Sequence, residues 1–428
     1  MRKHIFLVIM VLIGYCSQAQ SNKITYTLNQ MIDSALMHYS VSLQKGIYDQ
    51  QSTLNLQNIE TGYYPTFNLN GQASYQSDVT KLNVPIPGFT APEISKDWYK
   101  LNLDITQMIY DGGNRKGQQS VEEYTHKGQI NAVVLQEYRY REMVTKLYFR
   151  ELLFNQNINV LKSNSIALLT TLKELEAAFK AGMVLQADVN AIKAENLILK
   201  QKIIETENNK LATLNMLAAY TGISLNIADS LQIPVINIEQ LVYINLRPEY
   251  TQLNLQQSTL DKKKSVISVK QRPIIQAYGQ LGYGRPGLNM LDDNFTGYYI
   301  TGVRLNYKFW DWNTAKHEKQ ILGLQQQVLE TEKQNFELNL RANYLAQLQE
   351  IEKINQLLAS DQEIISLQST VVDASKKRLQ NGVITTAAYI QEFEKFTKSQ
   401  IDFETNKIKL VNAKIDYMFL TGNFNTNE

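Results

Sequence analysis

The residue types that most often carry catalysis or bind metal ions are few in this sequence and are not grouped. His38, His126 and His317 share no metal-ligand spacing, and Cys16 is the only cysteine. The signature motifs of serine hydrolases, zinc proteases and phosphate-binding loops are absent. We therefore expect no enzyme, no metal site and no cofactor.

Two adjacent glycines, Gly112 and Gly113, come closest to a phosphate cradle, because they follow a strand-like segment and open a helix-like one. They lack the remaining glycines and the Lys-Ser or Lys-Thr pair that such a loop needs. Carboxylates are numerous in the helical segments, but such residues ordinarily form the solvated face of an amphipathic helix. The missing phosphate-binding residues favour a structural role for Gly112 and Gly113.

The composition permits a large folded core and argues against a polyanionic partner. The chain has 428 residues, a net charge of +2, 20% charged residues and 44% hydrophobic residues. This balance gives no reason to expect nucleic acid as a partner. The length allows two or three ordinary domains or one elongated one.

The first twenty residues have the layout of a secretory signal peptide. A basic start at 2–4 precedes an apolar run at 5–13, and Ser17 and Ala19 put small residues before a polar stretch. We expect residues 1–20 to be removed near Ala19 or Gln20. An alternative is that Cys16 is lipidated, although bulky Tyr15 does not suit a lipobox.

No later segment has eighteen consecutive apolar residues, so we expect no transmembrane helix. An exported chain of this kind is periplasmic, secreted or a β-barrel.

The chain repeats itself once, at an offset of 200 residues. Asp111 is matched by Asp311, Gly182 by Gly382, and Thr221-Gly222 by Thr421-Gly422. We expect a first repeat at 21–224, a linker at 225–237, a second repeat at 238–422 and a tail at 423–428. Each repeat has the order helix, Pro, strand, loop, strand, long helix, Gly turn, helix.

Alternating residues predict four strands, at about 66–76, 99–110, 274–284 and 298–310. In the first, Phe67 and Leu69 point one way while Asn68 and Asn70 point the other. Each strand has about the ten residues that cross a bilayer when tilted. An ordinary soluble sheet with one core face is the alternative.

Aromatic residues stand near the strand ends, as in the aromatic belts at membrane interfaces. We predict the following as membrane-interface residues: Trp98, Tyr99, Tyr110, Tyr298, Tyr299, Trp310 and Trp312.

Long helices account for most of the remaining sequence. From Asp111 to Gly182 is roughly 100 Å of helix at 1.5 Å per residue. Apolar residues recur at three- and four-residue steps there, as at Leu161, Leu168 and Leu175, and again at Leu357, Ile364 and Val371. Such runs predict coiled-coil-like packing, with turns at 181–187 and 381–386.

Four strands cannot close a barrel, and lipid-exposed sheet edges leave backbone groups unpaired. If these strands lie in a membrane, several copies must share one barrel. We therefore expect a homo-oligomer with a continuous lumen.

The chain resembles the TolC-like outer-membrane efflux proteins over nearly its whole mature length. The resemblance rests on Tyr64-Pro65, on the segment 107–113 (QMIYDGG), on 179–182 followed by Asp188-Val189, on 247–249 (RPE) and on 309–311 (FWD). It implies a mainly α-helical fold with a small membrane β part. It also implies a homotrimer with a shared twelve-stranded barrel and a periplasmic α-barrel of long antiparallel helices.

The resemblance also implies partners and site residues. A periplasmic adaptor protein would dock at the Gly turns, and an inner-membrane pump of RND, ABC or MFS type would supply the substrate. The matching residues are Ala181, Gly182, Met183, Asn381, Gly382 and Val383. A purely structural role in ending helices is the alternative.

Charged residues are the remaining site candidates. The resemblance implies an acidic ring at the periplasmic aperture, which Asp188 would supply; a solvated helix-start Asp is the alternative. The second repeat has Ala388 and Ile384 at the corresponding places, which weakens the case for a charge-latched gate. The barrel-lumen candidates are Lys100, Asp104, Arg304 and Lys308, with solvated strand charges as the alternative.

The sequence thus favours a passive outer-membrane channel subunit of an efflux or type I secretion system that reaches into the periplasm of a Gram-negative bacterium. The rival interpretation is an exported coiled-coil structural or adhesion protein, which would not need paired amphipathic strands.

Overall fold

The computed structural model describes residues 24–80, 94–236 and 241–424. The predicted signal peptide, Cys16 and residues 238–240, at which the second repeat is predicted to begin, lie outside the described residues. The described residues form two compact units, one within 44–132 and 251–335 and one within 24–43, 133–250 and 336–424. The unit of 44–132 and 251–335 is called the sheet unit below, and the other the hairpin unit.

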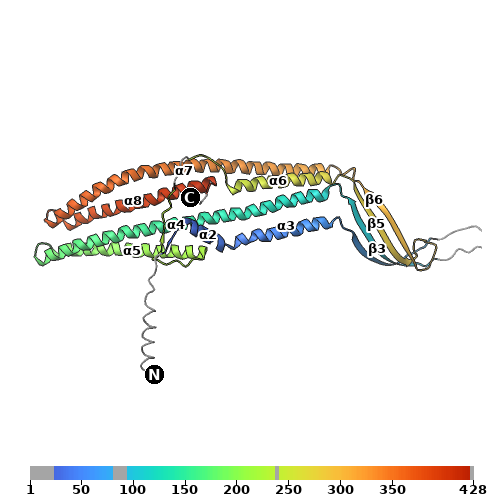
Figure 1. The fold of residues 1–428 in the computed structure, drawn as a ribbon, viewed down its shortest axis with the longest axis horizontal. Coiled ribbons are helices and arrows are strands. Elements are labelled where there is room, and N and C mark those ends of the chain that lie inside the picture. Colours follow the sequence, from blue (N-terminus) through green and yellow to red (C-terminus); the bar gives the residue numbers. More distant parts are fainter. Residues whose placement is uncertain (1–23, 81–93, 237–240, 425–428) are drawn as a thin grey trace, which may run out of the picture. The chain divides into compact units, whose positions relative to one another are not determined.

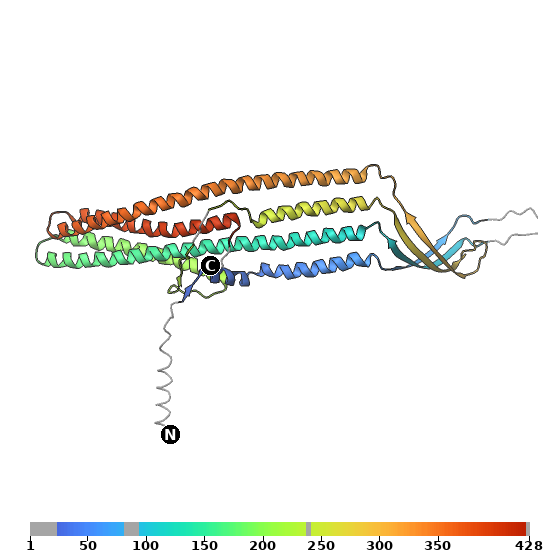
Figure 2. The same cartoon turned by 45° about the horizontal axis from the view of Figure 1, so that its top comes forward.

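The sheet unit contains one antiparallel sheet and the helix segments that lead into and out of it (Figure 1). Its strands pair in the order β2-β3-β5-β6. The elements are α3 (Gln44–Thr61), β2 (Thr66–Tyr75), β3 (Asp97–Tyr110), the start of α4 (Asn114–Lys180), α6 (Pro248–Val269), β5 (Ile274–Arg285), β6 (Thr296–Asn306) and the start of α7 (Thr314–Gln380). Figure 2 shows the helices of this unit side by side in the order α3, α4, α6, α7.

The strand register separates an apolar face of the sheet from a polar one. Leu69 pairs with Leu103, Leu103 with Leu281, and Leu281 with Tyr299, so one row across all four strands is apolar. The neighbouring row begins with Asn70 paired to Asn102. Successive residues of a strand point to opposite faces, so the alternation in the sequence becomes two chemically distinct surfaces.

An aspartate ends each strand-to-helix connection. The Asp111 carboxylate accepts hydrogen bonds from the backbone N–H groups of Gly113 at 2.8 Å and Arg115 at 2.6 Å. Asp311 accepts one from the N–H of Ala315 at 3.0 Å. The first N–H groups of a helix lack partners within it, so these carboxylates cap α4 and α7. Because these N–H groups already donate to the Asp111 carboxylate, they are not free to bind a phosphate at Gly112-Gly113.

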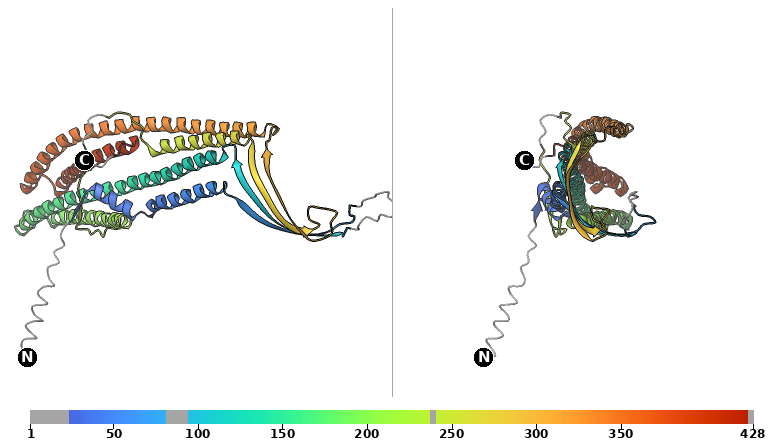
Figure 3. Two further views of the ribbon diagram at one scale, coloured as in Figure 1. Left: turned by 45° about the vertical axis from the view of Figure 1, so that its right-hand side comes forward. Right: turned by 90° about the vertical axis from the view of Figure 1, so that its right-hand side faces the viewer.

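The hairpin unit consists of helices that reverse at two short turns. Its elements are β1 (Thr25–Tyr26), α2 (Leu28–His38), the 3-10 helix η1 (Ser40–Leu43), the remainder of α4, α5 (Gln186–Thr221), β4 (Ser230–Leu231), the remainder of α7 and α8 (Thr386–Thr421). Helices α4 and α7 each have 67 residues, and α5 and α8 each have 36. In Figure 3, α5 lies beside α4 and α8 beside α7.

A heptad-spaced apolar core holds the hairpins together near their turns. Leu161, Leu168 and Leu175 of α4 are buried, with Leu168 completely inaccessible. They pack in one cluster with residues of the other three helices, including Ile192 of α5 and Phe393 of α8. The first predicted apolar run is therefore largely core.

A second core lies farther from the turns and includes helix α2. Met31 and Ile32 are fully buried there against Tyr148 of α4 and Leu217 of α5. Beside it, Lys210 and Glu151 form a buried ion pair at 3.3 Å, with side chains 5% and 0% exposed. The Lys210 ammonium also donates to Asn155 Oδ1 at 3.0 Å and to the Ile227 carbonyl at 3.2 Å. Burial raises the pKa of the Glu151 carboxyl, and Lys210 opposes that rise.

Two predicted element limits differ from the structure. The helix of the second half begins at Pro248, and residues 241–247 have no helical conformation. Proline suits the first turn of a helix, because the N–H that it lacks would have no partner there. Strand β6 ends at Asn306 instead of 310, opposite Ile274, the first residue of β5. Pro273 precedes Ile274 and cannot donate to the ladder, so pairing stops there.

We expect Lys210→Met to destabilise the chain because it leaves the Glu151 carboxylate buried without its counter-charge. Breaking a buried pair in this way costs about 3–5 kcal/mol. The midpoint of thermal unfolding, followed by circular dichroism at 222 nm, should fall. The double variant Lys210→Met with Glu151→Met should recover most of the loss, and equal midpoints for single and double variants would contradict this account.

Candidate functional site

The predicted lumen charges all lie outside the apolar face, but they do not pair with one another. Asp104 accepts hydrogen bonds from the side-chain amides of Asn70 at 2.5 Å and Gln280 at 2.6 Å. Arg304, on β6, lies opposite Gln276, and its guanidinium stands 5.1 Å from the centre of the Tyr278 ring. Strand β5 separates the two charges. The polar face thus carries amides together with side chains of both charge signs.

Lys100 and Lys308 differ in position. Lys100 pairs with Gln72 on the polar face, and its ammonium lies 5.1 Å from the Trp98 ring centre. Lys308 lies beyond the end of β6 and is exposed. The structure therefore places three of the four predicted lumen residues on the strands.

Two tyrosines that the sequence reasoning did not assign to the lumen lie across the polar face. Tyr298 pairs with Gly282, and its hydroxyl donates to Asn102 Oδ1 at 2.7 Å. A Cβ atom on Gly282 would stand 2.2 Å from the Tyr298 ring, so glycine is needed for this close approach. Tyr278 lies over Gly302 in the same way. Gly282 and Gly302, the glycines that face these rings, were the available signal in the sequence.

The predicted interface aromatics divide between the two faces. Tyr99 and Tyr299 lie on the apolar face, where they are 44% and 72% exposed. Trp98 and Tyr298 lie on the polar face, opposite Ser74 and Gly282. Adjacent residues of a strand point to opposite faces, so Trp98 and Tyr298 lie on the other face of the sheet from Tyr99 and Tyr299.

The other three aromatics lie near the helix-bearing end of the strands. Tyr110 closes β3 and is 43% exposed. Trp310 and Trp312 follow β6, are 62% and 80% exposed, and meet edge to face with centres 5.7 Å apart. Trp312 has a φ of 55°, which is unusual for a large side chain. The exposed indole pair is thus held on a strained backbone.

The two Gly turns have the same geometry. Gly182 and Gly382 adopt φ values of +75° and +69°. Met183 N–H donates to the Ala178 carbonyl and Val383 N–H to the Arg378 carbonyl, at 2.9 and 2.8 Å. These bonds end α4 and α7 in Schellman motifs, which require a left-handed residue.

Each turn presents exposed apolar side chains. Met183 is 72% exposed and Val383 65%, while Ala181 and Asn381 are also exposed. A Cβ on Gly182 or Gly382 would meet nothing within 4 Å. Open space around the glycines means that only the backbone conformation, not crowding, requires them.

Asp188 connects the starts of α5 and α8. Its carboxylate accepts a hydrogen bond from the Leu185 N–H at 3.2 Å and another from the Thr386 hydroxyl at 2.7 Å. Thr386 is only 2% exposed. Both oxygens of the predicted aperture residue thus have partners in the same chain. The sequence reasoning missed Thr386, because nothing in the primary structure reveals which helix start faces Asp188.

Further polar contacts join the hairpins. Glu174 of α4 accepts from Lys376 and Gln380 of α7, each at 3.0 Å. Glu195 of α5 is 5% exposed, and burial raises the pKa of its carboxyl, which the Glu394 carboxylate of α8 raises further. The two hairpins are therefore tied at one level by several side-chain contacts.

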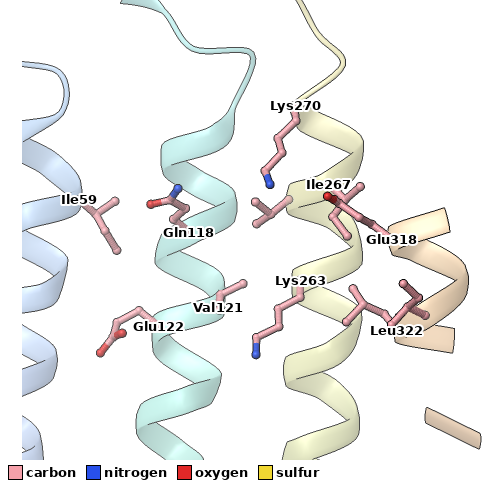
Figure 4. A pocket seen from close by; sticks show the side chains of 11 residues that line it. Ile59, Gln118, Val121, Glu122, Lys263, Ile267, Lys270, Glu318 and Leu322 are labelled. Carbon is pink, nitrogen blue, oxygen red and sulfur yellow. The ribbon is translucent and has the colours of Figure 1, made fainter. Parts of the chain in front are cut away.

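Two open grooves run along the helices of the sheet unit. The first, of about 610 Å³, is lined by α3, α4, α6 and α7, and Figure 4 shows Val121, Ile267 and Leu322 around it with Lys263 and Glu318. The second, of about 600 Å³, continues along α4, α6 and α7 and shares Lys263. Aliphatic side chains prevail in the first groove, whereas Gln and Thr side chains share the lining of the second with aliphatic ones. No set of convergent catalytic groups lines either groove.

Within the residues that the structure describes, no group of three or more His, Cys, Asp or Glu side chains could hold a metal ion. Over the same residues, no helix has the length and apolar character needed to cross a membrane.

We expect Asp188→Ala to loosen the start of α5, because it removes the cap and the bond to Thr386; loss of such a cap costs about 1 kcal/mol. Hydrogen exchange followed by mass spectrometry should show faster exchange of amides at 185–190. The matched control, Thr386→Val, loses only the bond between helices and should change exchange less. Unchanged exchange in Asp188→Ala would contradict the capping role.

Comparison with known proteins identifies the fold. No protein-family model and no curated protein matches the sequence. Among solved structures, the Campylobacter jejuni CmeC outer membrane channel matches with 16% identity and a TM-score of 0.68, covering 94% of this chain and 87% of that one. The Vibrio cholerae outer membrane protein VceC matches with 13% identity and a TM-score of 0.67, covering 92% of this chain and 96% of that one.

The open state of the Neisseria gonorrhoeae MtrE outer membrane channel also matches, with 16% identity, a TM-score of 0.60 and coverage of 90% of this chain and 88% of that one. Identities this low establish the fold. The resemblance to TolC-like proteins that the sequence predicted is thereby confirmed at the level of the fold: the chain has the fold of these outer-membrane channels.

Proposed function

We propose that the chain is a subunit of a homotrimeric outer-membrane channel that passively conducts substrates from an inner-membrane pump and a periplasmic adaptor to the cell exterior. The observation that carries this proposal is the sheet. Its apolar face is exposed, with Leu69 at 69% and Leu281 at 54%. An ordinary soluble sheet would bury that face against a core, whereas a membrane sheet turns it to lipid.

The free edges of the sheet support assembly from several copies. Strands β2 and β6 stand at the two ends of the strand order. In lipid, their unpaired backbone groups would find no water, so the sheet must close on itself. Four strands are too few, since small barrels need about eight. Because β2 and β6 run in opposite directions, β6 of one copy can pair antiparallel with β2 of the next; three copies give twelve strands.

The polar face of the sheet would then line the lumen. Lys100, Asp104 and Arg304 would form a mixed-charge lining with the surrounding amides, and Lys308 would lie beyond the strands. Tyr99, Tyr299, Tyr110, Trp310 and Trp312 would meet the membrane interface. A lumen lined by charges of both signs would discriminate only weakly between substrates, so substrate specificity would belong to the pump.

The Gly turns are the proposed adaptor-docking sites. A helix of 67 residues rises roughly 100 Å, enough to carry a turn far from the membrane. Exposed Met183 and Val383 beside Gly182 and Gly382 offer apolar contacts to a partner helix. Asp188 lies beside these turns, where three copies would form an acidic ring at the aperture. Both of its oxygens are already bonded, so we propose that it positions the turns as well.

We further propose that the two halves, 21–224 and 238–422, are copies of one unit. The support is the equal length of α4 and α7 and of α5 and α8, with starts 200 residues apart. Three chains with two similar repeats each would therefore place six similar units around the channel.

The proposal predicts a heat-modifiable oligomer in the outer-membrane fraction. After detergent extraction, the unheated protein should migrate on a denaturing gel as a trimer and the boiled protein as a monomer. Barrel closure between chains is the physical reason, because it pairs every strand edge. A soluble, elongated dimer would instead support the rival structural or adhesion role.

Gly382→Pro should abolish export while leaving trimer insertion intact. Proline fixes φ near −65° and cannot adopt the +69° of this position. Accumulation of a fluorescent efflux dye in cells, together with the amount of trimer, measures the two effects. The matched control is Gly382→Ala, which has open space and should retain more export. Wild-type export by Gly382→Pro at normal trimer levels would refute the docking assignment.

A further inference from the structure

The two grooves of the sheet unit adjoin one another and have no role in the proposed channel. Both lie along α4, α6 and α7, and Lys263 of α6 lines both of them. Together they form one trough, which follows α6 from Gln252 to Lys270 for about 27 Å of helix. Their volumes, about 610 and 600 Å³, lie in the range of sites that hold small organic molecules.

The trough lies in the middle of the unit. Helices α4 and α6 are the two inner members of the row in Figure 2. Figure 4 shows Ile59 of α3 and Leu322 of α7 at the two sides of the first groove. At the end farther from the sheet, the Asn131 side-chain amide donates to Gln252 Oε1 at 2.9 Å and joins α4 to α6. A neighbouring copy would meet α3 and α7 first, so this chain alone supplies the middle of the trough.

The two grooves differ in polarity. Aliphatic side chains of three helices form the first, among them Val121, Ile267 and Leu322. The second also has amide and hydroxyl side chains that can donate or accept hydrogen bonds: Thr125, Gln129, Gln252, Gln256, Thr259 and Gln325. An elongated site with one apolar end and one hydrogen-bonding end suits an amphiphilic molecule.

Lys263 stands where the two grooves meet. The first groove balances Lys263 and Lys270 with Glu122 and Glu318, whereas Lys263 is the only charged residue that lines the second. No carboxylate of the described residues forms an ion pair with the Lys263 ammonium. Figure 4 shows its side chain extending from α6 into the space between α6 and α4. The polar end of the trough therefore offers one positive charge without a counter-charge.

A glycine keeps the second groove open. Gly128 lies in the interior of α4, where glycine is less favourable than alanine. A Cβ atom there would meet only the Gln252 side-chain nitrogen, at 3.9 Å, so crowding does not require glycine. Gly117 of the same helix differs, because a Cβ atom there would stand 3.0 Å from Val266. Since Gly128 lines the second groove, its missing side chain leaves room for a ligand.

We propose that the trough binds a single-chain anionic lipid with hydroxyl groups in its head, of the lysophosphatidylglycerol type. The aliphatic chain lies in the first groove, nearer the sheet. The phosphate pairs with the Lys263 ammonium, and the glycerol hydroxyls meet the amide and hydroxyl side chains of the second groove. The site needs only the fold of the sheet unit, so this inference goes beyond the proposed function and does not rest on it.

Native mass spectrometry of the full chain in detergent, titrated with lauroyl lysophosphatidylglycerol, tests the role of Lys263. Lys263→Gln should raise the Kd about fivefold, the effect of losing one exposed charge contact, and Lys263→Arg should retain binding. The matched control Lys116→Gln removes an exposed charge of α4 that lines neither groove and should bind as wild type. Lauroyl lysophosphatidylcholine should bind more weakly, because its choline puts a positive charge near Lys263.

Gly128→Leu tests the open space independently of charge. Leucine favours a helix more than glycine does, so the variant should fold, which circular dichroism at 222 nm checks. Its side chain should fill the second groove and abolish the binding that depends on Lys263. The matched control Gly128→Ala adds only a Cβ atom in open space and should retain binding.

The outcomes separate this site from the channel. Wild-type affinity in both Lys263→Gln and Gly128→Leu would mean that the lipid binds elsewhere, for instance on the apolar face of the sheet, and would overturn the site. Equal affinity for the two lipid heads would also overturn it, because Lys263 would then play no part. Binding that follows the predicted pattern in a chain that forms no oligomer in the membrane would support the site and contradict the proposed function alone.

Discussion

The rest of the structure depends on one constraint: the backbone groups at the edges of the sheet need partners. The rows from Leu69 to Tyr299 make one face apolar and leave it exposed, while β2 and β6 each have an open edge. Water can satisfy such edges, but hydrocarbon cannot. A sheet with this face in lipid must therefore recruit strands from other copies.

The long helices continue from the strands of the sheet. Asp111 and Asp311 cap α4 and α7 a short distance beyond β3 and β6, so the strands lead into long helices. At the far ends, left-handed Gly182 and Gly382 reverse the chain. Capping aspartates and left-handed glycines thus set where the helices and turns begin. The spacing of apolar residues sets which helix surfaces pack against another helix. Substrate specificity enters nowhere in this scheme, which suits a passive conduit.

The strands and helices could be predicted from the periodic spacing of apolar residues. The contacts between elements could not be predicted from the sequence. Alternation at 66–76 and the prolines before β2 and β5 located the strands within a few residues. The sequence reasoning did not assign the interface aromatics to faces, although the alternation along a strand puts Trp98 and Tyr298 on the opposite face from Tyr99 and Tyr299. The α7 run from Leu357 to Val371 looked like core, because spacing reports a buried stripe without saying whether the same chain or another copy buries it. The bond between Asp188 and Thr386 depends on tertiary placement that no local pattern reveals.

Hydrogen exchange at the sheet edges tests the central claim most directly. In the membrane-inserted protein, the account predicts that amides of β2 and β6 are protected as strongly as those of β3 and β5, because every edge is paired with a neighbouring copy. Rapid exchange confined to the outer edges of β2 and β6, with β3 and β5 protected, would show an open sheet and contradict the account.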